Sequence, residues 1–253
     1  MAAVSPLLQT RGLSRSFGGL RAVDGVDFSL NAGEIRAIIG PNGAGKTTFV
    51  SLVCGRSAPS AGTILFEGVD VTRLPAHQRV KRGIAYTFQI TSIFANLSVF
   101  DNVALAAQRR LIDHAERGGS RFSPADLRRG VAEALERVGL ADRAEQAAGK
   151  LAYGHQRLLE VAMGLALEPR LLILDEPTQG LSDAEIDGFI ALVRDIARSA
   201  TVLLIEHNMP VVMALADRIT VMNNGAVLAE GTPAEIRADS AVQHAYLGTP
   251  DDD

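Results

Sequence analysis

The stretch GPNGAGKTT at residues 40–48 combines three glycines with a lysine and two threonines. Its spacing fits the phosphate-binding pattern G-x-x-x-x-G-K-[ST], with Gly40, Gly45, Lys46 and Thr47 in the fixed positions. The glycines allow a tight turn whose backbone N–H groups surround phosphate oxygens, and a helix that follows adds its positive N-terminal end. The stretch therefore predicts a nucleotide site in which Lys46 contacts the β- and γ-phosphates and Thr47 binds Mg²⁺. The alternative is a glycine-rich turn that binds nothing.

Two acids supply what a phosphate cradle lacks for hydrolysis, namely a second metal-binding group and a group that positions water. Asp175 and Glu176 close the apolar run LLILDEP. A buried carboxylate at a strand end is costly unless it faces a metal or a metal-bound water, which predicts that role for Asp175. Glu176 could orient and deprotonate the attacking water. The alternative is a surface Asp-Glu pair that caps the next turn.

Two further polar residues extend the predicted hydrolytic site. His207 ends a second apolar run in LLIEHN, where a neutral imidazole could contact the γ-phosphate; it could equally be an ordinary core or surface histidine. Gln89, in YTFQ, is uncharged and could contact Mg²⁺ or water without altering the charge of the site. Gly154, in LAYGHQRLLE, begins a helical pattern whose N-terminus could face an anion, although it lies far along the chain from the glycine loop.

The elements that must position these residues alternate between strand and helix. Residues 7–39 are β-rich, and the run EIRAIIG leads directly into the glycine loop and a helix over 46–54. The runs RLLILDEP and TVLLIEH have the profile of buried parallel strands. Residues 90–165 are helical in character and look like a lobe inserted between strands. The pattern predicts an α/β fold with a mostly parallel sheet covered by helices.

Local signals predict several element ends. Ser123 is a suitable N-cap for a helix over SPADLRRGVAEALERVGL, and the polar, glycine-containing stretch 113–122 predicts a break before it. Residues 182–185 and 232–235 form capping boxes, the second opening a closing helix. The residues around 223–225 predict a hairpin turn.

Composition narrows the class of protein. With 25 basic and 29 acidic residues the net charge is −4, which does not suggest a nucleic-acid binder. Cys54 is the only cysteine, so we expect a small buried hydrophobe and neither a disulfide framework nor a cysteine metal site. No apolar run is long enough to span a membrane, and the N-terminus lacks a secretory pattern. We therefore expect a cytoplasmic chain that reaches a membrane only through partners.

Five motifs together resemble the ATP-binding-cassette (ABC) ATPase subunits. GPNGAGKTT, YTFQ, LAYGHQR, LLILDEP and IEH occur in the family's order along essentially the whole chain. The resemblance implies one ABC ATPase domain over 1–253, with a P-loop NTPase core at 1–89 and 166–253, an antiparallel β subdomain, and a helical subdomain at about 90–165. The implied cofactors are ATP and Mg²⁺.

The resemblance also implies residue roles. Catalytic roles fall on Glu176 as base, His207 as switch histidine and Gln89 as the Q-loop residue. The metal-binding residues would be Thr47, Gln89 and Asp175. The residues implied to contact ATP are Phe17, which would stack on adenine, and Gly40, Pro41, Asn42, Gly43, Ala44, Gly45, Lys46, Thr47 and Thr48. Phe17 could instead be a packed strand residue.

The signature motif would complete the ATP site of a second subunit in a head-to-tail pair. Its residues here are Leu151, Ala152, Tyr153, Gly154, His155 and Gln156. The family usually reads L-S-G-G-Q, so Ala152 removes a serine hydroxyl contact worth about 0.5–1.5 kcal/mol, and Tyr153 and His155 replace a glycine and the glutamine. Ser182 stands where many members have aspartate, which affects the contact expected across the dimer.

These departures resemble the ATPases of branched-chain amino acid importers, in which a tyrosine before the signature glycine is common. That resemblance implies a homo- or heterodimer with a second ABC ATPase subunit, two integral-membrane permeases and, indirectly, a periplasmic solute-binding protein. The chain would lie on the inner face of a bacterial cell membrane. One alternative is import of urea, amides or aromatic acids. Another is a lipopolysaccharide-type exporter, for which an LSGGE-like signature would be expected. A third is a soluble non-transport ATPase that acts on ribosomes or DNA.

One charged stretch has two interpretations. Residues 107–130 contain six arginines against three acids. They form either a solvated helical face or a contact with a permease loop or anionic lipid.

Overall fold

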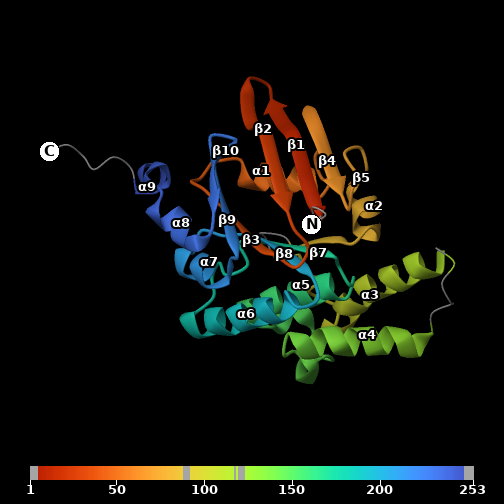
Figure 1. The fold of residues 1–253 in the computed structure, drawn as a ribbon. Helices are drawn as coiled ribbons and strands as arrows, with labels where there is room; N and C mark the ends of the chain where they lie inside the picture. The colour runs from red at the N-terminus through yellow and green to blue at the C-terminus, as the bar shows by residue number, and fades with distance from the viewer. Residues whose placement is uncertain (1–4, 88–91, 117, 119–122, 248–253) are drawn as a thin grey trace.

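The computed structural model describes residues 5–87, 92–116, 118 and 123–247, which form two sheets and the helices around them (Figure 1). The first sheet is antiparallel and has the order β2 (Leu20–Leu30), β1 (Leu8–Phe17), β4 (Ala61–Phe66), β5 (Val69–Asp70). The second has the order β10 (Ala226–Gly231), β9 (Arg218–Asn223), β3 (Ile35–Ile39), β8 (Thr201–Ile205), β7 (Leu171–Asp175), β6 (Ile84–Thr87). Its strands pair in parallel, except that β10 pairs antiparallel with β9.

The helices follow in chain order. They are α1 (Lys46–Val53), α2 (Ala76–Lys81), α3 (Val99–Glu116), α4 (Pro124–Arg137), α5 (Tyr153–Leu165), α6 (Asp183–Ile196), α7 (Met209–Leu215), α8 (Pro233–Ala238) and α9 (Ser240–Leu247), with 3₁₀ turns at Ala141–Arg143 and Ala148–Lys150. The predicted α/β class, with a mostly parallel sheet, an antiparallel sheet and an inserted helical lobe, is confirmed.

The central strands are buried on both faces, as their continuous apolar runs predict. Ile173 and Leu203 point to the face that packs on α1 and, beyond it, on the antiparallel sheet. Leu172 and Leu204 point to the opposite face, which α3, α4, α5 and α6 cover. Helix α1 is thus held between two sheets, and its N-terminus, where the glycine loop ends, is fixed from both sides (Figure 1).

The helices α3, α4 and α5 lie between β6 and β7 in the sequence, although these two strands are neighbours in the sheet. The helix predicted over SPADLRRGVAEALERVGL is present as α4, and one face of it is apolar: Val131 and Leu135 are buried, and Leu127 packs against the same cluster. Ser123 accepts the N–H of Asp126 and forms a capping box.

The predicted break at 113–122 is wrong at its start, since α3 continues to Glu116. Asp113 pairs with Arg109 one turn earlier and with Lys81 of α2, and these ion pairs extend the helix across a polar sequence. Arg110 pairs with Glu168. Because both Arg109 and Arg110 form ion pairs, they are not part of a purely solvated face. Arg117 and Arg121 lie outside the described residues.

The C-terminal elements follow the local signals with one change. Both predicted capping boxes are present, at Ser182–Glu185 and Thr232–Glu235. The β9–β10 hairpin turns at Asn224, which adopts a positive φ of 48°. The expected closing helix is divided into α8 and α9 by Asp239, whose backbone is extended.

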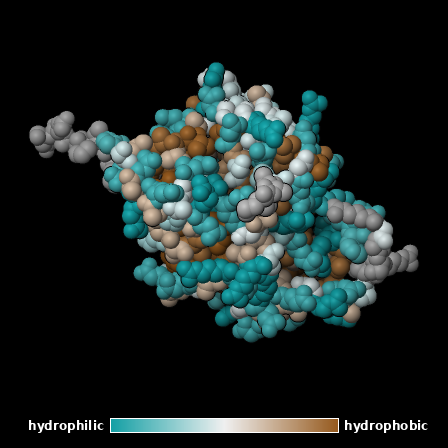
Figure 2. Space-filling model, in the orientation of Figure 1, coloured by the Kyte–Doolittle hydropathy of each residue, from teal (hydrophilic) through white to brown (hydrophobic). Residues whose placement is uncertain are grey.

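Two expectations drawn from composition can be compared with the structure. Cys54 is buried at the C-terminal end of α1, and burial raises the pKa of its thiol to about 12. Within the described part of the chain, none of the helices combines the length and apolar character needed to cross a bilayer. The face in Figure 2 is mostly hydrophilic, with hydrophobic side chains in separate small groups.

Candidate nucleotide-binding site

The glycine loop joins β3 to α1 and has a geometry that only glycine allows at two positions. A Cβ on Gly40 would lie 2.2 Å from the carbonyl oxygen of Met222. Gly45 has a φ of 96° and begins α1, and a Cβ there would lie 2.2 Å from the carbonyl oxygen of Ala22. The loop is therefore packed against β9 on one side and β2 on the other.

Lys46, the first residue of α1, is buried inside the loop. Its Nζ donates hydrogen bonds to the carbonyl oxygens of Gly40 at 2.6 Å and Pro41 at 3.0 Å. Burial lowers the pKa of the ammonium, and the nearby charges of Glu176 and Asp175 oppose that shift. The ammonium of Lys46 thus lies between the carbonyl oxygens of the loop and the acidic residues at the end of β7.

Asp175 ends β7 with its carboxylate almost fully buried. Tyr86 of β6 donates its hydroxyl to Oδ2 at 2.7 Å, whereas Oδ1 is buried without a hydrogen-bond partner among the described residues. Burial raises the pKa of this carboxyl, and the hydrogen bond from Tyr86 partly offsets the shift. Burial also raises the pKa of Tyr86, so the phenol keeps the proton that it donates.

Glu176 has a φ of 46°, a conformation that a non-glycine residue rarely adopts. Its backbone N–H donates to the carbonyl oxygen of Ile205 at 2.8 Å, which holds the turn after β7 against the end of β8. Its Oε1 lies 3.9 Å from Nδ1 of His207, whose side chain is 60% exposed. The structure therefore brings these two predicted catalytic residues to one sheet edge.

A cleft of about 500 Å³ opens beside the glycine loop. Residues from four distant segments line it: Phe17, Leu20, Arg21, Ala22, Asn42, Gly43, Ala44, Gly45, Lys46, Thr47, Thr48, Glu176 and Asn224. Phe17 is 49% exposed, and the guanidinium of Arg15 lies 4.5 Å from the centre of its ring. A half-exposed aromatic ring at the rim leaves apolar area available for a planar base.

The signature residues lie elsewhere. None of the described residues at 151–156 lines this cleft. Ala152 is the N-cap of α5 and provides no side-chain cap. Tyr153 is exposed, and its ring packs so closely on Gly180 that a Cβ there would lie 2.8 Å from it. A Cβ on Gly154 would lie 2.2 Å from a carboxylate oxygen of Glu185.

Gln89 lies outside the described residues, so its predicted role is neither supported nor contradicted.

Tyr86 and Glu206 contact site residues but do not appear in the predicted set. The pairing of β6 with β7 places Tyr86 opposite Ile173, on the same sheet face as Asp175. That contact could have been found from the strand order, which the motifs alone do not specify.

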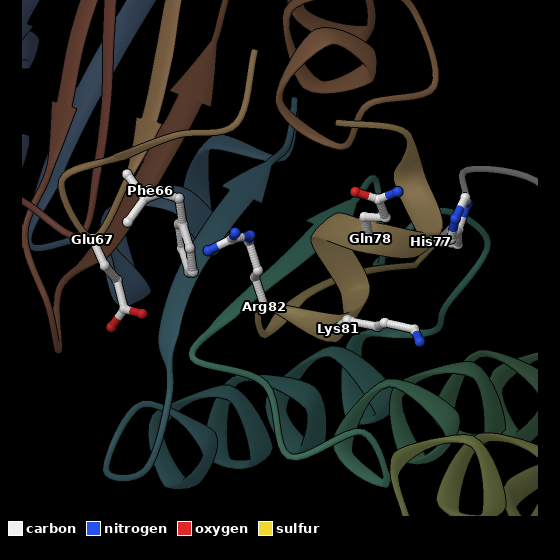
Figure 3. Close-up of a pocket in the computed structure, with 7 residues that line it drawn as sticks. Phe66, Glu67, His77, Gln78, Lys81 and Arg82 are labelled. Atoms are coloured by element: carbon white, nitrogen blue, oxygen red, sulfur yellow. The ribbon is translucent and has the colours of Figure 1, made fainter. Parts of the chain in front are cut away.

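A second cleft, of about 600 Å³, lies between α2 and the β4–β5 turn (Figure 3). It is larger than the cleft at the glycine loop but contains none of the predicted site residues. Two of its charged groups have partners elsewhere, since Lys81 pairs with Asp113 and Glu116 and Glu67 pairs with Arg170. Size alone therefore does not identify the functional site.

A glycine loop between a parallel strand and a helix, beside an acidic strand end, defines a P-loop nucleotide-binding protein. Residues 23–179 match the family described as ABC transporter, and residues 226–252 match the family described as branched-chain amino acid ATP-binding cassette transporter. The chain belongs to the ABC transporter family and is an ATP-binding ABC ATPase.

Relatives along nearly the whole chain support this assignment. The branched-chain amino acid transport ATP-binding proteins BraF of Pseudomonas aeruginosa and LivG of Escherichia coli K12 are 40% and 42% identical, each alignment covering 96% of this chain and 98% of the relative. The lipopolysaccharide export protein LptB of Escherichia coli K12 is 34% identical, with 95% and 97% covered. The ADP conformation of the ABC cassette MJ1267 superposes with a TM-score of 0.85 at 26% identity, covering 96% of this chain and 99% of the other.

Proposed function

We propose that the chain hydrolyses Mg²⁺-bound ATP as one half of a pair of cassettes and thereby drives uptake of branched-chain or related amino acids through permease partners. The carrying observation is the cleft at the glycine loop, which gathers Phe17, Lys46, Thr47 and Glu176 from distant segments. For the transport role, the support is the relatedness to BraF and LivG over almost the full chain.

In this proposal the backbone N–H groups of 40–48 and the ammonium of Lys46 hold the β- and γ-phosphates. Lys46 already lies within reach of loop carbonyls and would exchange them for phosphate oxygens. Phosphoryl transfer requires mainly positioning and charge stabilisation. Glu176 would orient the attacking water and accept its proton, and the neighbouring, more exposed His207 would contact the γ-phosphate.

The residues present fit a magnesium ion. Oδ1 of Asp175 is a buried acceptor without a partner among the described residues. Thr47 lines the cleft at the glycine loop together with Glu176, the residue that follows Asp175. An oxygen-rich donor set suits this hard cation, and Mg²⁺ commonly retains waters between itself and carboxylates. When bound, the ion would neutralise charge that develops on the phosphate oxygens. Gln89 remains a predicted contributor.

The position of the signature motif supports action on a second subunit. Residues 151–156 lie outside the cleft that holds the glycine loop, so the N-terminus of α5 would face the nucleotide of the partner cassette. We propose a head-to-tail pair with two nucleotides between the subunits. The partner is either a second copy of the chain or a related ATPase. When ATP closes the pair, the helical lobe at about 90–165 would move with it.

The proposed assembly contains two integral-membrane permeases, with a periplasmic solute-binding protein acting through them, and places the chain on the inner face of the cell membrane. Solute specificity would belong to the binding protein and the permeases. Importers of urea, amides or aromatic acids remain alternatives of the same mechanism. A lipopolysaccharide-type exporter is less well supported, because the C-terminal match at 226–252 is to the branched-chain amino acid group.

The test is a mild-detergent pull-down of the tagged Glu176→Gln chain from its native cells with ATP present. Loss of the base should preserve the ATP-bound pair, so we expect two multi-span permeases and a second cassette to be recovered. The Lys46→Ala chain is the matched control and should not form the ATP-dependent cassette pair. Recovery of ribosomal or DNA-bound proteins with no membrane subunit would contradict the transport role while leaving the ATPase assignment intact.

A further inference from the structure

Glu206, the residue after β8, has a carboxylate that contacts two loops at once. The residue is 1% exposed. Its Oε1 accepts the backbone N–H of Thr178 at 3.0 Å and also the Thr178 hydroxyl. Its Oε2 accepts the backbone N–H groups of His207 at 2.9 Å and Asn208 at 3.0 Å. Each oxygen is thus committed to a different loop.

The two loops are those that carry the proposed hydrolytic groups. Thr178 lies two residues after Glu176, in the turn that follows β7, and His207 follows Glu206 itself in the loop after β8. The backbone N–H of Glu206 also approaches the carbonyl oxygen of Ile38 at 3.4 Å, which ties the residue to β3. Glu206 therefore connects the base, the histidine and the strand that leads into the glycine loop.

The chemistry requires a carboxylate at this position. All four groups around it are donors, and an ionised carboxylate accepts on both oxygens. A glutamine of the same size has one acceptor and one donor group. With its NH₂ toward His207 and Asn208, the glutamine would face two backbone donors. With its NH₂ toward Thr178, the hydroxyl of Thr178 can rotate to accept, but the backbone N–H of Thr178 loses its acceptor. Either orientation leaves at least one buried donor without a partner and weakens the hold on one of the two loops.

We propose that Glu206 is a positioning residue that couples the Glu176 loop to the His207 loop, so that the water-activating and γ-phosphate-contacting groups move as one unit. The inference rests on the roles proposed for Glu176 and His207. Glu206 itself does not contact nucleotide in this account. It acts through the hydrogen bonds that hold Thr178 and His207.

The experiment compares Glu206→Gln with wild type in the full chain, measuring kcat, KM for ATP, and the melting temperature. A displacement of about 1 Å in a catalytic group can lower a rate by ~10²-fold, so we expect kcat to fall roughly 10- to 100-fold. ATP affinity, measured in the hydrolysis-deficient Glu176→Gln background, should be unchanged, because the glycine loop is intact. A residue with only a structural role would lower the melting temperature without this split between kcat and KM.

Two further variants complete the test. Glu235→Gln is the matched control, since Glu235 accepts a backbone N–H and a threonine hydroxyl in the capping box of α8, away from the site; its kcat should equal that of wild type. If Glu206→Gln fails to fold, Thr178→Val removes one donor at constant shape and should lower kcat several-fold with unchanged ATP affinity.

The outcomes separate the inference from the function on which it rests. Wild-type kcat in folded Glu206→Gln, or in Thr178→Val where Glu206→Gln does not fold, would overturn the inference while leaving the proposed ATPase mechanism in place. A wild-type chain that fails to hydrolyse ATP, alone or with its partners, would instead overturn the proposed function.

Discussion

Tyr86 provides a sharp test of the proposed metal site, because a single hydroxyl can be removed there without changing the shape of the side chain. The Tyr86→Phe variant deletes the hydrogen bond to Oδ2 of Asp175, which measures 2.7 Å. Oδ1 of the same carboxylate has no partner among the described residues. The substitution would therefore leave a buried carboxylate poorly oriented at the position where we propose that Mg²⁺ is held.

The expected magnitude follows from these contacts. A hydrogen bond to a charged group contributes about 1.5–3 kcal/mol, and loss of a residue that orients a metal-binding carboxylate typically weakens metal affinity by ~10- to 100-fold. We expect the Mg²⁺ concentration for half-maximal ATP hydrolysis to rise at least about tenfold. Mn²⁺ binding in the presence of a non-hydrolysable ATP analogue, followed by electron paramagnetic resonance, should weaken by a similar factor.

The control is nucleotide binding in the absence of divalent cation, which should be unchanged because Phe17 and the glycine loop are untouched. A melting temperature near that of wild type would exclude general unfolding as the cause. If Mn²⁺ binding and the Mg²⁺ dependence of hydrolysis both remain at wild-type values, Asp175 is not oriented by Tyr86 and this part of the account is wrong.

Three other substitutions have defined expectations. Phe17→Ala should weaken ATP and GTP binding by a similar amount, about 1–3 kcal/mol, because stacking does not distinguish bases; equilibrium fluorescence titration would measure it, and unchanged affinity would exclude a stacking role. Arg36→Met should lower the free energy of unfolding by about 3–5 kcal/mol, since it leaves the buried carboxylate of Glu34 without its cation and also removes the pair with the more exposed Glu230. Urea unfolding would measure the loss, and a stability equal to wild type would contradict it. Asp113→Asn tests a pH dependence. Burial raises the pKa of the Asp113 carboxyl, but the hydrogen bonds from Lys81 and Arg109 lower it by more, so the pKa is lowered on folding. The stabilisation from the ionised Asp113 is therefore present above the ordinary aspartate pKa of about 3.9 and is lost as the pH falls through the lowered value. The difference in stability between wild type and variant should be constant near neutrality and should disappear in acid. A difference that persisted in acid would contradict the reasoning.

Much of the site could be predicted from sequence because its main parts are local. The glycine loop, the strand before it and the helix after it are covalent neighbours, so their spacing alone specifies the geometry around Lys46. The apolar runs before Asp175 and His207 are typical of buried parallel strands, and parallel strands end at the same sheet edge. The proximity of Glu176 and His207 follows from that rule.

The contacts that could not be predicted depend on which strands are neighbours and on side-chain packing. Tyr86 reaches Asp175 only because β6 pairs with β7, although a helical lobe separates these strands in the sequence. The ion pairs of Asp113 extend α3 through a stretch whose composition indicates a break. Glu206 directly precedes His207 in the sequence, yet only the fold specifies the four groups that donate hydrogen bonds to its carboxylate.

The central claim is that the cleft beside the glycine loop binds and hydrolyses ATP with Glu176 as the base. The most direct measurement compares phosphate release and ATP binding in wild type and Glu176→Gln, each reconstituted with its partner subunits. General-base catalysis contributes about 10²- to 10⁴-fold, so the account predicts that Glu176→Gln binds ATP as tightly as wild type and releases phosphate at least about a hundredfold more slowly. Equal rates of phosphate release in the two proteins would contradict it.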